Sequence, residues 1–231
     1  MKNTTISVIA LGLALSAQPA FAEAFNGPYV GIEGSHESYE VKAEDLEIFG
    51  ALVSLDGLSG NGKSGGIYAG YDVPMSENFF VGAEASVGYS GASVTVSGSS
   101  LPALEPQGIT LQAVAVQDTV GVTLKARETF GISGRIGANI GGTGVYAKLG
   151  YANTRFKATG TENGAVLVSE SRTEGAFVYG GGLQAALTEK LSVRAEFTVA
   201  DYGDAGLLAD LGTQGLKVSN SKTSVGLLYR F

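Results

Sequence analysis

The feature that most constrains this chain is an alternation, with a period of two residues, between apolar side chains and small or charged ones. In the segment 80–89, one face carries Val81, Ala83, Ala85, Val87 and Tyr89, and the other carries Phe80, Gly82, Glu84, Ser86 and Gly88. Segments 130–140, 145–152 and 191–200 repeat the pattern. This period indicates β-strands, because successive side chains of a strand point to opposite sides. The second face is too polar for a core between two packed sheets, so the pattern predicts a barrel wall that faces lipid.

Eight segments fit this reading, and the connections between them alternate in length. The strands are predicted at 28–40, 64–73, 79–89, 122–140, 145–157, 174–187, 191–202 and 222–231. The long connections are 41–63, 90–121, 158–173 and 203–221, and the links between them are short. Short periplasmic turns and long outer loops are typical of bacterial barrels. We therefore predict an all-β fold, an eight-stranded antiparallel transmembrane up-and-down β-barrel, with room for an extra hairpin where Ile109 to Val116 alternates.

The first 22 residues have the three parts of a secretory signal peptide. Lys2 precedes an apolar run from Ile6 to Leu15, and the small residues Ala20 and Ala22 form the cleavage pattern. The apolar run is shorter than the roughly 20 residues that a membrane-spanning helix needs. We expect removal of 1–22 to leave a barrel of residues 23–231 in the outer membrane of a Gram-negative bacterium.

Composition excludes several kinds of chemistry. The chain of 231 residues has no cysteine, which rules out disulfides, thiolate metal sites and a cysteine nucleophile. Its 22 acidic side chains outnumber 15 Lys and Arg, for a formal net charge of -7. This balance disfavours nucleic-acid binding, because phosphate contacts need clustered basic residues. We expect no nucleic acid and no cofactor.

Several stretches resemble known small outer-membrane barrels. The end of the chain, Ser224-Val225-Gly226-Leu227-Leu228-Tyr229-Arg230-Phe231, is similar to their terminal strand. Residues 180–184 and 191–197 resemble the sixth and seventh strands of the OmpA membrane domain and of the opacity-type outer-membrane proteins. Residues 27–31 resemble their first strand, and 80–84 their third. The OmpA peptidoglycan-binding domain has no counterpart in the printed sequence, so we expect the single-barrel, opacity-type family to be the better match.

The inward face of the predicted strands carries charges of both signs. Its polar members are Glu33, Glu84, Arg135, Lys148, Arg194 and Glu196, with Gln184 beside them. An eight-stranded barrel is just wide enough for side chains to fill it, so we expect opposite charges to pair there. The resemblance implies the same, since Glu84, Lys148, Gln184 and Arg194 fall where the OmpA domain has a lumenal charge network, although that domain has a Glu in place of Gln184. A static plug and a set of switchable ion pairs both fit these residues.

Two glycine-rich motifs have simpler readings than nucleotide binding. Residues 57–64, Gly-Leu-Ser-Gly-Asn-Gly-Lys-Ser, match the phosphate-loop pattern. A working phosphate loop is followed by a helix whose N-terminus holds the phosphates, whereas residues 65–71 read as a strand. We therefore interpret 57–64 as an outer loop. Residues 141–144 are interpreted as a tight turn.

The sequence contains few residues that would indicate a catalytic or metal-binding site. A Ser-His-Asp arrangement must use His36, the only histidine, which falls on the lipid-facing phase near the outer end of the first strand. Surface acids could bind Ca2+, although such acids more often solvate a loop. They are Glu44, Asp45, Glu47, Asp201 and Asp204. We expect no catalytic residue and no metal site.

The sequence therefore predicts a structural and surface-interaction role, for which the resemblance implies antigen, adhesion and host-contact properties. The expected partners are outer-membrane lipid and lipopolysaccharide, and possible host or surface ligands at the outer loops. The resemblance also implies the barrel-assembly machinery, which reads the terminal strand through Val225, Leu227, Tyr229 and Phe231. We expect a monomer. The alternatives are a small pore for ions or solutes, gated by the lumenal charges, and a lipid-modifying enzyme.

Overall fold

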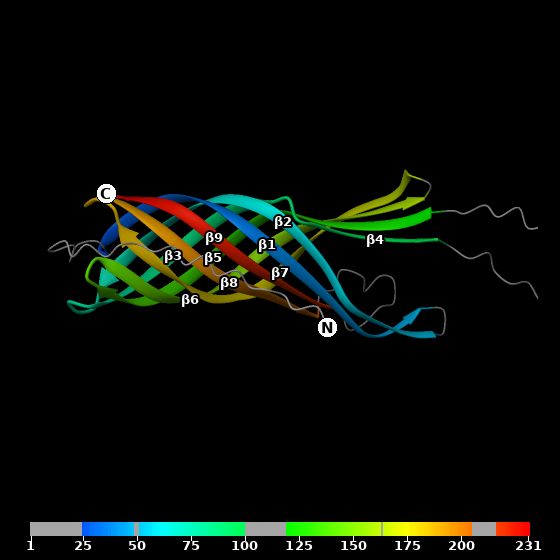
Figure 1. Ribbon diagram of the computed structural model, residues 1–231, viewed down its shortest axis with the longest axis horizontal. Helices are drawn as coiled ribbons and strands as arrows, with labels where there is room; N and C mark the ends of the chain where they lie inside the picture. The colour runs from blue at the N-terminus through cyan, green and yellow to red at the C-terminus, as the bar shows by residue number, and fades with distance from the viewer. Residues whose placement is uncertain (1–24, 49–50, 100–118, 163, 205–215) are drawn as a thin grey trace, which may run out of the picture.

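The computed structural model describes residues 25–48, 51–99, 119–162, 164–204 and 216–231 (Figure 1). Its strands are β1 (Gly27–Ile48), β2 (Ala51–Pro74), β3 (Phe79–Ser90), β4 (Ser93–Ser99), β5 (Thr119–Ile140), β6 (Thr143–Glu162), β7 (Ala165–Ala186), β8 (Leu191–Asp204) and β9 (Leu216–Arg230). Within this described part of the chain, no helix is long and apolar enough to cross a membrane.

The strands form one antiparallel sheet that closes on itself. Their order is β3-β2-β1-β9-β8-β7-β6-β5-β4, and β3 also pairs with β5. Only Gly91 and Ala92 separate β3 from β4, and both strands pair with β5, so they share one position around the barrel. The predicted eight-stranded up-and-down barrel is confirmed. Closure gives every wall strand a partner on each side, which satisfies the backbone hydrogen bonds without water.

The first and last strands meet along most of their length. β1 pairs with β9 from Tyr29 opposite Arg230 to Ala43 opposite Leu216. The short turns at 75–78, 141–142 and 187–190 lie at the same end of the barrel as the C-terminus (Figure 1). Gly141 and Gly142 have φ values of 60° and 84°, a left-handed backbone that glycine adopts without steric cost, so the predicted tight turn is present.

The strands extend farther than predicted at the opposite end. Residues 41–48 and 51–63, predicted as one long loop, belong to β1 and β2, and most of 158–173 belongs to β6 and β7. The phosphate-loop match at 57–64 is therefore strand rather than loop. Outside the lipid, outward side chains need not be apolar, so the alternation ends although backbone pairing continues. β4, whose residues Ser93 to Ser97 do alternate, lies within the predicted connection 90–121 and was missed there. The hairpin considered at 109–116 lies outside the described residues.

Exposed apolar side chains cover the outside of the wall between two sets of aromatic rings. At the end with the long extensions, the rings are Tyr89, Phe130, Tyr151 and Phe177, which we call the outer girdle. Tyr151 and Phe177 lie directly opposite on β6 and β7, with ring centroids 5.5 Å apart. At the end with the short turns, the rings are Tyr71, Phe79, Tyr229 and Phe231. Two aromatic girdles around an apolar band are the usual pattern of a barrel wall in a membrane.

Candidate functional site

The lumen of the barrel is the candidate site, because the polar faces of all eight wall positions converge there. It begins at the short-turn end with a packed aromatic cluster of Phe25, Phe80 and Tyr146. The Phe25 and Phe80 rings are stacked, with centroids 4.7 Å apart. This cluster fills the short-turn end with apolar groups.

Next to the aromatic cluster, one carboxylate holds two arginines. Asp72 of β2 is fully buried and pairs with both Arg135 of β5 and Arg230 of β9. Arg135 Nε donates to Asp72 Oδ1 at 2.9 Å, and Arg230 Nη2 donates to Asp72 Oδ2 at 2.8 Å. Arg135 Nη1 also donates to Gln184 Oε1 of β7, at 3.3 Å. We call these four residues the Asp72 cluster; they carry one more positive than negative charge.

A second, larger set of ion pairs lies nearer the middle of the barrel. Arg194 Nη1 donates to Glu84 Oε2 at 2.5 Å, and Arg194 Nη2 donates to Glu33 Oε2 at 3.0 Å. Lys148 Nζ bridges Glu84 and Glu196, with distances of 2.8 and 2.9 Å. This Arg194 network brings together β1, β3, β6 and β8, so it ties the wall across the lumen.

Further partners leave the Arg194 network balanced. Lys222 Nζ of β9 pairs with Glu33 Oε1 at 2.5 Å, so the network holds three acids and three bases. The Tyr29 hydroxyl donates to Glu84 and the Tyr146 hydroxyl to Glu196, at 3.0 and 2.8 Å. Each charged side chain of the network therefore has a partner of opposite charge. This pairing stabilises the fold, because a buried ion without a partner is strongly unfavourable.

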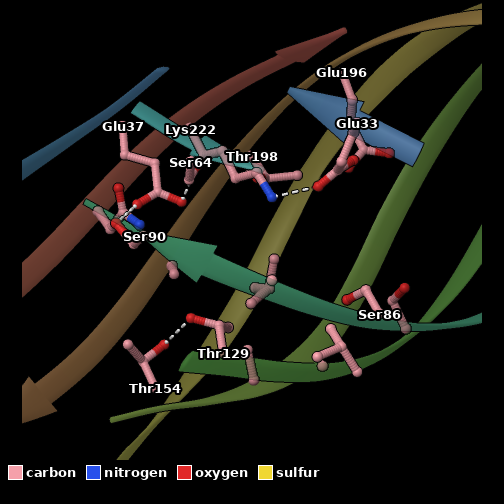
Figure 2. A pocket seen from close by; sticks show the side chains of 18 of the residues that line it. Glu33, Glu37, Ser64, Ser86, Ser90, Thr129, Thr154, Glu196, Thr198 and Lys222 are labelled. Atoms are coloured by element: carbon pink, nitrogen blue, oxygen red, sulfur yellow. Dashed lines mark hydrogen bonds and ion pairs between the residues drawn. The ribbon is translucent and has the colours of Figure 1, made fainter. Parts of the chain in front are cut away.

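A small polar cavity lies beyond the Arg194 network, on the side of the long extensions. Its lining includes Glu37, Ser64 and Thr154 (Figure 2). Its volume is about 90 Å3, which is enough for a few water molecules. Glu37 lies in its wall and accepts hydrogen bonds from the hydroxyls of Ser64 and Ser90, at 2.8 and 2.6 Å. Buried Asn220 also lines the cavity, and its Oδ1 has no hydrogen-bond partner among the described residues. The cavity therefore presents hydrogen-bonding groups that can hold water.

A second apolar cluster lies on the outer side of this cavity. Its main side chains are Tyr39, Phe156, Tyr202 and Val218, with small alanines between them. The Phe156 ring lies 6.0 Å from that of Tyr39 and 5.3 Å from that of Tyr202. Apolar clusters thus lie at both ends of the charged lumen.

The structure places all seven predicted lumenal residues in the interior, in two separate groups. Glu33, Glu84, Lys148, Arg194 and Glu196 belong to the Arg194 network, whereas Arg135 and Gln184 belong to the Asp72 cluster.

Sequence reasoning missed four charged lumenal residues, which are Glu37, Asp72, Lys222 and Arg230. Their phase in the alternation could have found them. Asp72 lies between outward Tyr71 and Val73, and Arg230 lies between outward Tyr229 and Phe231.

The remaining candidates lie elsewhere. His36 is exposed on the outward face of β1, away from the lumenal hydroxyls. Among the described residues, no group of three or more His, Asp or Glu side chains could hold a metal ion. The side chains of Glu44, Asp45, Glu47 and Asp204, and the cleavage residues Ala20 and Ala22, are outside what the structure describes.

Comparison with known proteins identifies the family. The outer membrane protein beta-barrel domain matches residues 7–231. The 31 kDa outer-membrane immunogenic proteins of Brucella melitensis biotype 1 and Brucella suis biovar 1 are each 27% identical over 226 residues, which cover 94% of this chain and 88% of theirs. The solved structure of Ail, the attachment invasion locus protein of Yersinia pestis, is 15% identical, with a TM-score of 0.47, and the match covers 89% of this chain and 99% of that one. Neisserial surface protein A is 15% identical, with a TM-score of 0.45 and coverages of 89% and 98%. The predicted relationship to small outer-membrane barrels is confirmed: the chain belongs to the outer membrane protein beta-barrel domain family, and it is an integral protein of the Gram-negative outer membrane.

Proposed function

We propose that this protein is a closed barrel that reinforces the outer membrane and presents its outer strand extensions as an interaction surface. The observation that carries the proposal is the filled lumen, in which Arg194 binds Glu33 and Glu84 across the barrel. A pore needs a continuous wet path, whereas here ion pairs lie between two apolar clusters. The part of the molecule free to meet a partner is then the outer end.

The outer extensions suit this role because they are paired strands. β1 and β2 remain paired out to Ile48 opposite Ala51, and β6 and β7 out to Glu162 opposite Ala165 (Figure 1). Hydrogen-bonded extensions hold their shape better than open loops, which lowers the entropy lost on binding. The Brucella relatives are named as immunogenic proteins, and we propose that the extensions of this chain are likewise accessible to antibodies.

Single-channel recording tests the closed lumen. We expect protein purified from outer membranes to give no reproducible current steps in a planar bilayer, although heat-modifiable gel mobility shows it to be folded. Current steps from the folded protein that change with Arg194→Ala would contradict the proposal. They would instead support a small pore, the second candidate, for which the polar cavity of about 90 Å3 would be part of the path.

Removing residues 158–168 tests the interaction surface. This segment pairs only within the β6–β7 extension and with the outer part of β5, so the barrel below it should remain folded. We expect cells that express this deletion to adhere less to epithelial monolayers than cells with the full chain. Substitution of the exposed turn residues Glu189 and Lys190 by serine, at the other end, is the control, because it keeps the backbone there. Equal adherence of all three strains would count against the surface role.

We propose further that the chain is exported by cleavage after Ala22 and assembled through its C-terminal strand. Val225, Leu227, Tyr229 and Phe231 lie on the outward face of that strand and are exposed. The Tyr229 and Phe231 rings are 5.5 Å apart at its end. An apolar strand face of this kind is available to the barrel-assembly machinery before β9 pairs with β1.

We also propose that the protein acts as a monomer without catalytic activity. The closed sheet supports the monomeric state, because each strand of the wall pairs on both sides within one chain and no edge requires pairing with a second copy. The position of His36 supports the lack of catalytic activity, because it lies on the opposite side of the wall from Ser64 and Ser90. Absence of hydrolysis or acyl transfer when the purified barrel is incubated with outer-membrane lipid would agree with this. An activity that His36→Ala abolishes would favour the lipid-modifying enzyme.

A further inference from the structure

A cluster of basic side chains lies on the outward face of the wall, just outside the outer girdle. Its members are Lys63 of β2, Lys125 and Arg127 of β5, and Arg155 and Lys157 of β6. All five are exposed or half-buried. We call them the basic patch. It is unexpected in a chain whose formal net charge is -7, so composition does not account for it.

Strand register places the three lysines of the patch close to one another. Lys125 and Lys157 are directly opposite each other on β5 and β6, on the same face. On the other side of Lys125, the link between β3 and β4 separates it from β2: the Gly91 nitrogen donates to the Lys63 carbonyl at 3.0 Å, and the Ala126 nitrogen donates to the Ala92 carbonyl at 3.1 Å. Lys63 therefore lies across the β3–β4 link from Lys125, offset by two residues along that link.

The two arginines lie one step closer to the girdle. A register shift between Ala126 and Thr129 inserts an extra residue into β5 opposite Arg155. Such a bulge re-aims side chains, and here Arg127 reaches the girdle residue Tyr89. Its Nη1 donates to the Tyr89 hydroxyl at 2.5 Å, and its guanidinium carbon is 5.6 Å from the ring centroid. This contact fixes the depth of the patch at the level where the apolar band ends.

The patch lacks enough negative charge within the protein. Within the described ranges, no ion pair involves four of the five cations, which are Lys63, Lys125, Arg155 and Lys157. Among the described residues of β2, β5 and β6 at this level, Glu128, opposite Tyr89, is the one carboxylate on the outward face, against five cations. Like charges that face each other directly across two strands destabilise a sheet. The Lys125 and Lys157 pair is thus an arrangement that an external anion would relieve.

We propose that the basic patch binds the phosphate groups of the glycolipid in the outer leaflet of the outer membrane. Its cations point sideways, into the plane of the membrane, and lie at the depth of lipid headgroups. Arg and Lys together suit phosphate, since the guanidinium supplies paired donors and the ammonium supplies a mobile point charge. A ligand anchored by acyl chains against the apolar band below would reach the patch without losing further orientational freedom.

Native mass spectrometry of the purified full-length barrel tests this site. The probes are lipid A with two phosphates and lipid A from which both phosphates have been removed, each added in detergent micelles. The variant is Lys125→Gln with Lys157→Gln. We expect phosphorylated lipid A to bind the unmodified barrel and the double variant to bind it about 30-fold more weakly, at about fivefold for each lysine near a charged lipid surface.

Matched variants separate this site from general electrostatics. Lys190→Gln, in the turn at the opposite end, removes an exposed charge and should leave binding unchanged. Arg155→Gln tests the patch independently if the double variant assembles poorly, which heat-modifiable mobility shows. Equal binding by the double variant and the unmodified barrel, or equal binding of lipid A without phosphates, would overturn the proposal. If soluble heparin binds in a lysine-dependent way and lipid A does not, the ligand is a soluble polyanion and the lipid assignment is wrong.

Discussion

The guanidinium carbon of Arg194 lies 3.6 Å from the centre of the Tyr68 ring. The ring covers one face of the guanidinium while its edge donors bind Glu84 and Glu33. Stacking and edge hydrogen bonds use different parts of the same planar group, so they reinforce each other. Lysine cannot reproduce this arrangement, which makes Arg194 the fixed centre of the lumen.

Removal of Arg194 should be costly. Arg194→Met leaves Glu84 and Glu33 each with one cation instead of two, and we expect the free energy of unfolding to fall by about 3 to 5 kcal/mol, as when one partner of a buried ion pair is deleted. Urea titration of the barrel in liposomes measures it. Lys222→Met is the matched control, because its side chain is partly exposed and its loss should have the smaller effect. Equal losses from the two variants would show that Arg194 has no special place in the network.

Gln184→Glu should stabilise the barrel. The Asp72 cluster has two arginines and one carboxylate, and the buried Gln184 Nε2 has no partner among the described residues. A glutamate supplies the missing charge next to Arg135 and removes the unpaired donor. We expect a gain of about 1 to 2 kcal/mol in the same titration. Gln184→Met, which removes the amide without adding charge, distinguishes the two contributions, and a loss of stability in Gln184→Glu would contradict this account of the cluster.

The two faces of β3 should respond differently to a new charge. Ala85 is exposed on the lipid side, whereas Ser86 lines the lumenal cavity. We expect Ala85→Lys to destabilise by about 2 to 4 kcal/mol, because a lysine near the middle of the bilayer loses its hydration. Ser86→Lys avoids that lipid penalty. The comparison fails if both variants unfold at the same urea concentration.

Deletion of Phe231 should reduce assembly. Its nitrogen donates to the Pro28 carbonyl at 3.2 Å and its ring packs near Tyr229, so it ends the strand that closes the barrel. We expect less heat-modifiable protein in the outer membrane at an unchanged rate of synthesis, measured by pulse labelling. An unchanged amount of assembled barrel would mean that the terminal ring is not part of the recognition signal.

Alternation predicted the wall well because lipid enforces it. Within the membrane, a residue such as Ala85 must be apolar and its neighbour Glu84 is free to be charged, so strand position and phase are both readable. Outside the membrane that requirement ends, so the sequence of the outer parts of β6 and β7 predicts a loop although the structure has paired strands there. The bulge after Ala126 also shifts the phase of β5, and alternation alone cannot locate the position of that bulge.

Pairing within the lumen could not be predicted in the same way. Arg194 and Glu84 are 110 residues apart, and they meet because of the stagger between strands around the closed barrel. The sequence shows that both point inward but carries no sign of that stagger. It therefore could not divide the inward charges into an Asp72 cluster and an Arg194 network, nor assign Arg230 to Asp72 rather than to Glu33.

The pairing of Asp72 with Arg230 has a consequence for how the chain distinguishes its correct closure from a wrong one. A slip of β9 by two residues along β1 keeps every apolar side chain facing lipid, so the hydrophobic pattern cannot detect it. The same slip moves Arg230 by roughly 7 Å, about two residue steps along a strand. The buried carboxylate of Asp72 then keeps only one of its two arginine partners. The lumenal charges thus act as a register check on the last step of assembly, sensitive to the one error that an alternating wall tolerates.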